Sequence, residues 1–160
     1  MRYAGLILND IAAAPGLCVS FFTQGCPHRC KGCQNPETWD FNEGKEFTVE
    51  VLNEILFGLT ANGIQRDLCI MGGEPLCNEN AFLTYMIIKE VKEKVPNAKI
   101  YIWSGYTYEQ LLEHSHPKVK QSLELADVLI DGPYIADERD ITLSMRGSRN
   151  QRIIDLSEKI

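Results

Sequence analysis

Short apolar segments alternate with amphipathic segments along this 160-residue chain, and this alternation constrains the fold more than any other feature. Runs of β-branched and aromatic residues predict strands at 3–8, 17–23, 67–71, 99–103, 127–130 and 153–154. Apolar residues at helical spacing predict helices at 48–62, 78–95 and 117–125, with a further short helix after 107. Strands that alternate with helices form a mostly parallel sheet covered by helices. The sequence therefore predicts the α/β class.

Residues that can begin or end helices stand at the expected boundaries. Thr48 and Asn78 can each cap the first turn of a long helix. Pro96 ends the second of these helices, because proline cannot continue a helix. Thr107, followed by Gln110 three residues later, is a capping-box pattern.

The composition indicates a soluble globular chain. Apolar residues make up 44% and charged residues 24% of the sequence, which is ordinary for such proteins. The length suits one hydrophobic core, so we expect a single domain over 1–160. The net charge of −6 argues against a nucleic-acid or anionic-membrane partner. No stretch is apolar over the roughly 18 residues that a membrane span needs, and the N-terminus is too polar for a signal peptide. We expect a cytoplasmic protein.

Glycines and polar residues follow the ends of four expected strands. Ligands of parallel sheets bind at the carboxyl ends of the strands, which lie on one edge. Four short segments should therefore meet on one rim. They are 25–26, 72–74, 104–106 and 131–134.

Three cysteines crowd into eight residues of the long loop 24–44. Cys26, Cys30 and Cys33 form a C-x3-C-x2-C pattern, and a loop of this length usually has a function. A [4Fe–4S] cluster on three cysteines keeps one iron with an open position, where chemistry can occur. A zinc knuckle is the alternative, with His28 or a distant cysteine as fourth ligand. The remaining cysteines are expected to be small buried hydrophobes; they are Cys18, Cys69 and Cys77.

The cysteine pattern, followed by Gly72-Gly73-Glu74-Pro75 after a later strand, resembles the radical S-adenosylmethionine superfamily. Within it, the chain is similar to the small activating proteins of anaerobic ribonucleoside-triphosphate reductases. The residues that carry this likeness span nearly the whole chain. They are Asn9-Asp10, Pro15-Gly16, Gly25-Cys26, His28, Gly32-Cys33, Asn35, Thr38-Trp39, 103–106, Asp131-Gly132, 146–148 and 150–151.

The resemblance implies a fold, a reaction and partners. The fold would be a small version of the open parallel β/α barrel of this superfamily. Cys26, Cys30 and Cys33 would hold a [4Fe–4S] cluster that reductively cleaves S-adenosylmethionine. The resulting 5′-deoxyadenosyl radical would take a hydrogen from a glycine of the reductase, making the chain a radical oxidoreductase. Reduced flavodoxin or ferredoxin would donate the electron, and no catalytic residue beyond the cluster and the cofactor is implied.

The same resemblance implies contacts to S-adenosylmethionine. Gly72 and Gly73 would let the main chain approach the methionine moiety. Glu74 would accept a hydrogen bond from its ammonium group. The adenosyl part would meet main-chain groups of Gly32, Cys33 and Gln34. The carboxylate and the ribose hydroxyls would meet Ser104 and Asp131.

Other functions stay open at this point. One is a radical enzyme that acts on a small molecule, such as the 7-carboxy-7-deazaguanine synthase type. Another is an activase of a different glycyl-radical enzyme, such as pyruvate formate-lyase. A zinc-binding structural module without catalysis is the third. The arginine-containing tail 146–152 is expected to be a solvated segment, with a contact to the active site or the partner reductase as the alternative.

Overall fold

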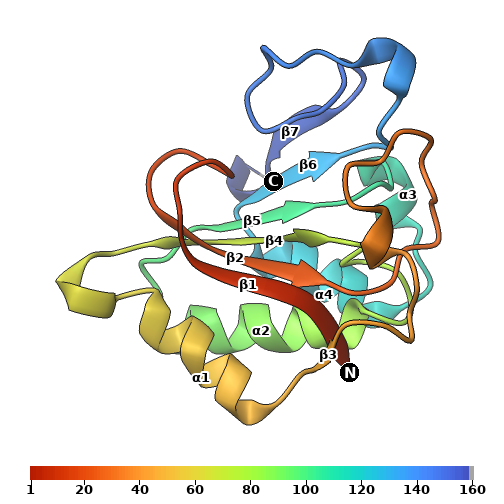
Figure 1. Ribbon diagram of the computed structural model, residues 1–160. Helices are drawn as coiled ribbons and strands as arrows, with labels where there is room; N and C mark the ends of the chain where they lie inside the picture. The colour runs from red at the N-terminus through yellow and green to blue at the C-terminus, as the bar shows by residue number, and fades with distance from the viewer. Residues whose placement is uncertain (159–160) are drawn as a thin grey trace.

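The computed structural model describes residues 1–158 and contains one seven-stranded mixed sheet (Figure 1). The strand order is β3-β1-β2-β4-β5-β6-β7. The strands are β1 (Arg2–Asp10), β2 (Cys18–Thr23), β3 (Lys45–Glu46), β4 (Asp67–Gly72), β5 (Ile100–Trp103), β6 (Val128–Asp131) and β7 (Arg152–Asp155). The four central strands β2, β4, β5 and β6 run parallel to one another. Strands β1, β3 and β7 pair antiparallel at the two edges.

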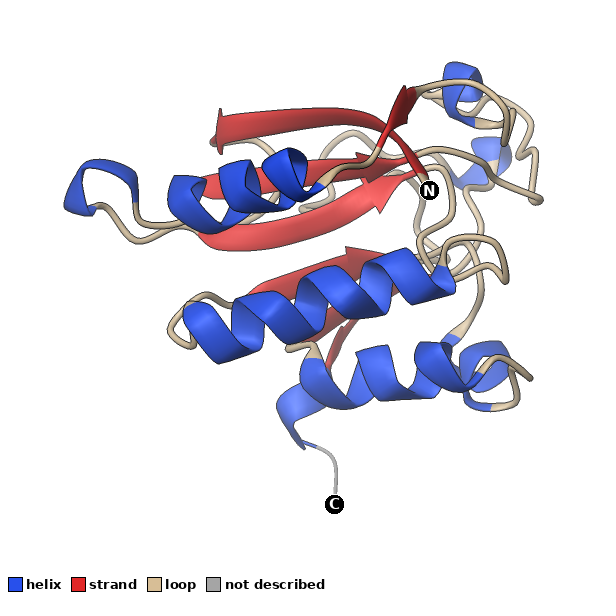
Figure 2. Ribbon diagram, turned by 90° about the horizontal axis from the view of Figure 1, so that it is seen from below, coloured by secondary structure: helices blue, strands red, loops and turns tan. Residues whose placement is uncertain are grey.

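The helices lie on one face of this sheet (Figure 2). They are α1 (Val49–Gly58), α2 (Ala81–Lys94), α3 (Tyr108–Leu112) and α4 (Pro117–Leu125). Helix α1 connects β3 to β4 along the chain, α2 connects β4 to β5, and α3 with α4 connects β5 to β6. Such crossover connections are what parallel neighbours require. The predicted α/β class is confirmed, and the parallel pairing is limited to the central strands.

Most helix boundaries follow the capping residues. The Thr48 side chain accepts a hydrogen bond from the Val51 N–H, and Thr107 with Gln110 forms a complete capping box. The prediction that Asn78 caps α2 was wrong, because the N-cap position belongs to Asn80. Helix α1 also ends at Gly58, earlier than predicted.

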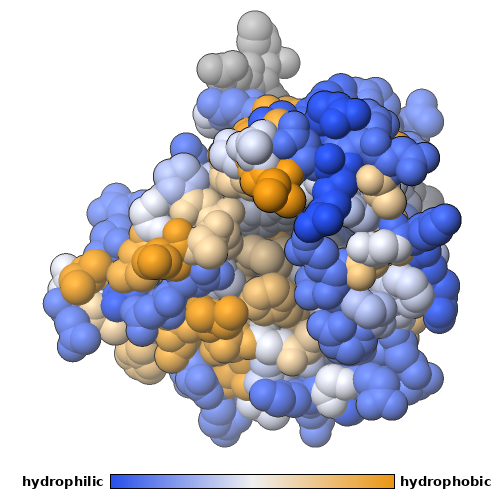
Figure 3. Space-filling model, turned by 45° about the horizontal axis from the view of Figure 1, so that its top comes forward, coloured by the Kyte–Doolittle hydropathy of each residue, from blue (hydrophilic) through white to orange (hydrophobic). Residues whose placement is uncertain are grey.

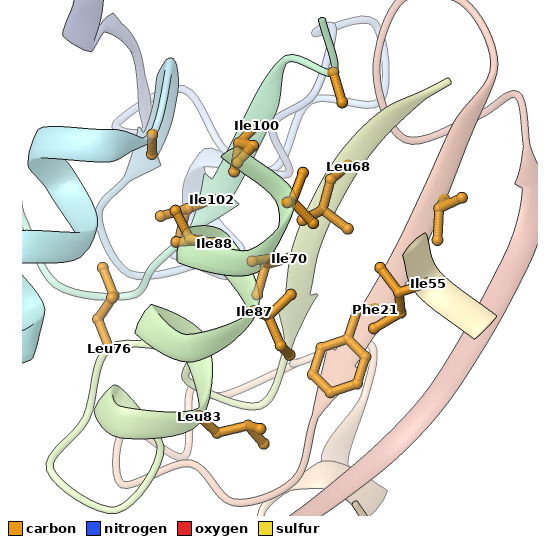
Figure 4. Close-up of a cluster of buried hydrophobic side chains, with 14 of the residues drawn as sticks. Phe21, Ile55, Leu68, Ile70, Leu76, Leu83, Ile87, Ile88, Ile100 and Ile102 are labelled. Atoms are coloured by element: carbon orange, nitrogen blue, oxygen red, sulfur yellow. The ribbon is translucent and has the colours of Figure 1, made fainter. Parts of the chain in front are cut away.

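The main core lies between the sheet and the helices (Figure 4). Alternate residues of each strand point to it, as the two-residue period of a strand requires. The core residues of the sheet are Val19, Phe21, Leu68, Ile70, Ile100, Ile102 and Leu129, and each is fully buried. Ile87 and Ile88 of α2 pack against them. Burying a side chain of this size stabilises the fold by about 1.5–3 kcal/mol.

The other face of the sheet carries a second, smaller cluster. Its buried members are Ala14, Cys18, Cys69, Tyr101, Val128 and Ile130. Met71, Trp103 and Met145 pack against this cluster and are only partly buried. None of the described α-helices covers this face (Figure 2), and the partly buried Met71 and Trp103 lie near the carboxyl ends of β4 and β5.

Candidate metal and cofactor site

A cavity of about 410 Å³ lies at the carboxyl ends of the four parallel strands. Residues of all four predicted rim segments line it, which confirms that these segments meet at one edge. The lining residues from these segments are Cys26, Gly72, Gly73, Ser104, Gly105, Gly132 and Tyr134. Met71 and Trp103 extend the lining along the helix-free face of the sheet. The space-filling view shows this side of the molecule hollowed, with mostly apolar colours on the floor (Figure 3).

The three cysteines of the loop line the cavity together. Cys26 is buried, whereas Cys30 and Cys33 are half-buried, and all three are free thiols. Burial raises the pKa of the Cys26 thiol, so a metal that binds there must displace a proton. The sulfur of Cys33 accepts a hydrogen bond from the Asn35 N–H at 3.4 Å.

The base of the cysteine loop is fixed to the end of β4. The Gly25 carbonyl accepts hydrogen bonds from the Glu74 N–H at 2.9 Å and from the Asn80 side chain at 3.2 Å. Gly73 lies so close that an added Cβ would stand 2.3 Å from the Gly25 oxygen. A glycine is therefore required at position 73 to bring the two loops together. Gly72 has a φ of +109°, a conformation that other residues rarely adopt.

The carboxylate of Glu74 is fully buried and accepts four hydrogen bonds. Its Oε1 accepts from His28 Nε2 and from the Gly105 N–H, each at 2.7 Å. Its Oε2 accepts from the Ser104 hydroxyl at 2.8 Å and from the Leu76 N–H at 2.9 Å. Because a carboxylate only accepts, His28 carries its proton on Nε2. Glu74 thus joins the cysteine loop to the ends of β4 and β5.

His28 is held from three sides, although it stands between two of the cysteines in the sequence. Besides its bond to Glu74, its ring packs edge-to-face on Tyr106 with 4.5 Å between centroids. An added Cβ on Gly105 would lie 2.6 Å from the His28 ring, so the close approach depends on that glycine. These contacts indicate that His28 positions the cysteine loop.

Asp131 is also engaged within the protein. Its carboxylate is 1% exposed and accepts hydrogen bonds from the Tyr108 N–H at 2.7 Å and from the Arg152 Nε at 3.1 Å. Arg152 also pairs with Glu109, and this hydrogen bond is the main cause that lowers the pKa of Glu109. Asp131 therefore fixes the start of α3 and the start of β7.

The segment 132–151, called the strap below, closes one side of the cavity. Trp103 Nε1 donates to the Met145 carbonyl at 2.8 Å. Gln151 accepts from the Gly147 N–H at 2.9 Å and donates to the Gly132 carbonyl at 3.0 Å. The Tyr134 ring lies near enough to Gly147 that an added Cβ would stand 3.0 Å from it. The strap is therefore tied to β5 and to the end of β6.

The predicted cofactor residues fall into two groups. Those that line the cavity are Cys33, Gln34, Gly72, Gly73 and Ser104. The others are Gly32, Glu74 and Asp131. Gly32 faces Tyr134, with 3.4 Å between an added Cβ and the ring, and both carboxylates are occupied by protein donors. The sequence reasoning missed Asn80, whose side chain donates to three carbonyls, and it missed the place of Met145 in the lining. Arg146, which belongs to the tail expected to be solvated, also lines the cavity.

The donor set fits an iron–sulfur cluster by its chemistry, since three free thiols of one loop line a single cavity. Within residues 1–158, no three His, Cys, Asp or Glu side chains are gathered closely enough to hold a metal ion. A three-thiolate site therefore requires the cysteine side chains to turn toward one point.

In the same part of the chain, no helix has the length and apolar character to cross a membrane.

Comparison with known proteins supports an iron–sulfur cluster site in this chain. The 4Fe-4S single cluster domain family matches residues 12–154, which defines the class as iron–sulfur cluster domains. The chain is 34% identical over 154 residues to the anaerobic ribonucleoside-triphosphate reductase-activating protein of Vibrio cholerae, covering 96% of this chain and 97% of the relative. The protein of the same name from Escherichia coli K12 is 33% identical, covering 94% of this chain and 96% of the relative. The one from phage T4 is 34% identical, covering 96% of this chain and 93% of the relative. This chain belongs to the family of anaerobic ribonucleoside-triphosphate reductase-activating proteins.

Proposed function

We propose that this chain activates an anaerobic ribonucleoside-triphosphate reductase by generating a glycyl radical on it. The reaction would be the reductive cleavage of S-adenosylmethionine at a [4Fe–4S] cluster. One observation carries the proposal: the three thiols of the cysteine loop share a cavity with the glycine pair at the end of β4. The names of the relatives support the choice of protein partner.

The cysteines would hold the cluster as thiolates. Cys26, Cys30 and Cys33 supply three ligands, so one iron would have no protein ligand and could take the cofactor. When bound, the cluster supplies the single electron that cleaves the sulfonium, and a reduced flavodoxin or ferredoxin would replace that electron. The chain itself has to bind the cofactor, orient it and limit side reactions.

The remaining site residues would bind or position the cofactor. Gly72 and Gly73 leave room for its methionine part, because they carry no side chain. Gln34 and Ser104 offer polar groups on the lining, and Gly32 and Cys33 would offer main-chain groups from the cysteine loop itself. Glu74 and Asp131 would act as positioning residues, since their carboxylates already hold parts of the rim.

The proposal extends to the fold. Four parallel strands with crossover helices on one face suit a small, open version of the radical S-adenosylmethionine barrel. We propose that residues 1–160 form one such domain.

An anaerobic reconstitution experiment tests the function. The protein is loaded with iron and sulfide and then incubated with the reductase, S-adenosylmethionine and a reductant. Electron paramagnetic resonance should show a glycyl radical on the reductase. Cys30→Ala should abolish the signal. Cys77→Ala is the matched control and should retain it, because that buried thiol donates to the Glu74 carbonyl away from the cavity.

Two outcomes would contradict the proposal. A colourless protein with one bound zinc would support a structural metal module. A brown protein that cleaves S-adenosylmethionine without forming a radical on the reductase would support another radical enzyme.

A further inference from the structure

Arg146 carries the one permanent positive charge among the described residues that line the cavity, and no aspartate or glutamate is part of that lining. Its Nε donates to the carbonyl of Ser144 at 3.2 Å, within the strap. In the described part of the chain, no carboxylate lies within ion-pair distance of its guanidinium. The terminal nitrogens of this group are therefore available to a ligand.

The main chain on both sides of Arg146 is anchored. The Met145 carbonyl accepts from Trp103 of β5 at 2.8 Å, and the Gly147 N–H donates to Gln151 at 2.9 Å. Met145 has a φ of +61°, which turns the chain sharply before the arginine. These contacts keep the base of the side chain at the cavity wall, so little backbone ordering is needed when a ligand binds.

The two carboxylates of the rim segments, Glu74 and Asp131, do not neutralise this charge. The carboxylate of Glu74 is occupied by His28, Ser104 and two main-chain N–H groups. The carboxylate of Asp131 is occupied by Arg152 and the Tyr108 N–H. Apart from the cysteine thiolates, which the cluster would engage, an anion brought by the ligand is the remaining partner. A guanidinium has five donors in a planar fork that matches a carboxylate.

We propose that Arg146 binds the carboxylate of the methionine moiety of S-adenosylmethionine. This inference rests on the proposed function, because it assumes that this cofactor occupies the cavity. The carboxylate is the single anionic group of the cofactor, whereas its ammonium and sulfonium groups are cations that a guanidinium repels. One arginine on the strap therefore selects which end of the cofactor faces the strap.

Equilibrium binding to the reconstituted protein tests this proposal without relying on turnover. Affinity for S-adenosylmethionine is measured anaerobically for the wild type and for three variants: Arg146→Gln, Arg146→Lys and Arg149→Gln. Arg149 is exposed on the same strap outside the cavity lining, so its variant controls for loss of charge. Hydrogen bonds to charged groups contribute about 1.5–3 kcal/mol. Arg146→Gln should thus weaken binding roughly 10- to 100-fold, Arg146→Lys less, and Arg149→Gln should match the wild type.

The decarboxylated analogue of S-adenosylmethionine isolates the contact. It should bind the wild type and Arg146→Gln with equal affinity, or too weakly to measure in both. Equal iron and sulfide content in all four proteins should accompany this result, because Arg146 holds no metal.

Two results would overturn the proposal. In one, Arg146→Gln binds S-adenosylmethionine as the wild type does; if radical formation on the reductase is then lost, Arg146 would be assigned to the protein partner. In the other, Arg146→Gln weakens the analogue as strongly as the cofactor. If the cluster-loaded wild type itself fails to bind S-adenosylmethionine, the proposed function fails first.

Discussion

Glu74→Gln should destabilise the protein even without a metal or a cofactor. The carboxylate accepts four hydrogen bonds and is fully buried. A glutamine amide has one oxygen, so one of the two acceptor positions becomes a donor. In either orientation, the main-chain N–H of Gly105 or of Leu76 loses its acceptor. A buried donor without a partner costs about 1–3 kcal/mol, and the remaining bonds change from charged to neutral. We expect a total loss of about 2–4 kcal/mol.

Urea unfolding of the metal-free protein, followed by far-ultraviolet circular dichroism, measures this loss. Glu79→Gln is the matched control, because Glu79 is exposed, and its effect should stay within about 0.5 kcal/mol. Equal free energies of unfolding for Glu74→Gln and the wild type would refute the reasoning. If Glu74→Gln weakened cofactor binding while leaving this stability unchanged, the carboxylate would act on the ligand, as the sequence first implied.

Three further predictions follow from the cysteines and glycines of the site. Cys26→Ser should lower the iron content after anaerobic reconstitution, whereas Cys77→Ser should keep it, as measured by iron and sulfide assay; equal loss in both would contradict the ligand set. Burial raises the pKa of Cys77 to about 12, so its neutral thiol should resist alkylation at pH 8 in the folded protein and react after unfolding, as read by mass spectrometry. Gly73→Ala should lower the melting temperature and the cluster content, because its Cβ would stand 2.3 Å from the Gly25 carbonyl. Gly5→Ala is the control, because its Cβ would stand 4.0 Å from the nearest atom, and it should change neither the melting temperature nor the cluster content. A Gly73→Ala protein with wild-type stability would disprove the steric requirement at position 73.

The elements of the fold were largely predictable because local signals agreed with the final structure. Each predicted strand overlaps an observed strand, and the capping box at Thr107 is present in full. The two-residue strand β3 was missed, since it exists only through its pairing with β1. The prediction that Asn78 caps α2 was wrong for a similar reason, since the N-cap is Asn80. Asn80 is held by carbonyls of the distant cysteine loop, which no local pattern reveals.

The location of the site was predictable, but the engagement of its polar side chains was not. Ligands bind at the carboxyl ends of parallel strands, and this rule correctly predicted that the four rim segments meet at one cavity. Glu74 and Asp131 look like ligand contacts in the sequence, because a motif does not show which protein groups compete for a carboxylate. Their partners His28 and Arg152 lie far away in the chain. The sequence favours a solvated tail at 146–152, with a contact to the active site or the partner reductase as the alternative, and the place of Arg146 on the cavity wall depends on the anchors of the strap.

The helices cover one face of the sheet, and the hollow is visible on the outer surface (Figures 2 and 3). The described residues therefore form the floor and the rim of the cavity and leave its outer side open. Under the proposed function, a protein substrate would approach the cavity from this open side. Under the proposed function, the reductase would complete the enclosure as it docks, and shielding of the reactive species from water would begin only with the complex.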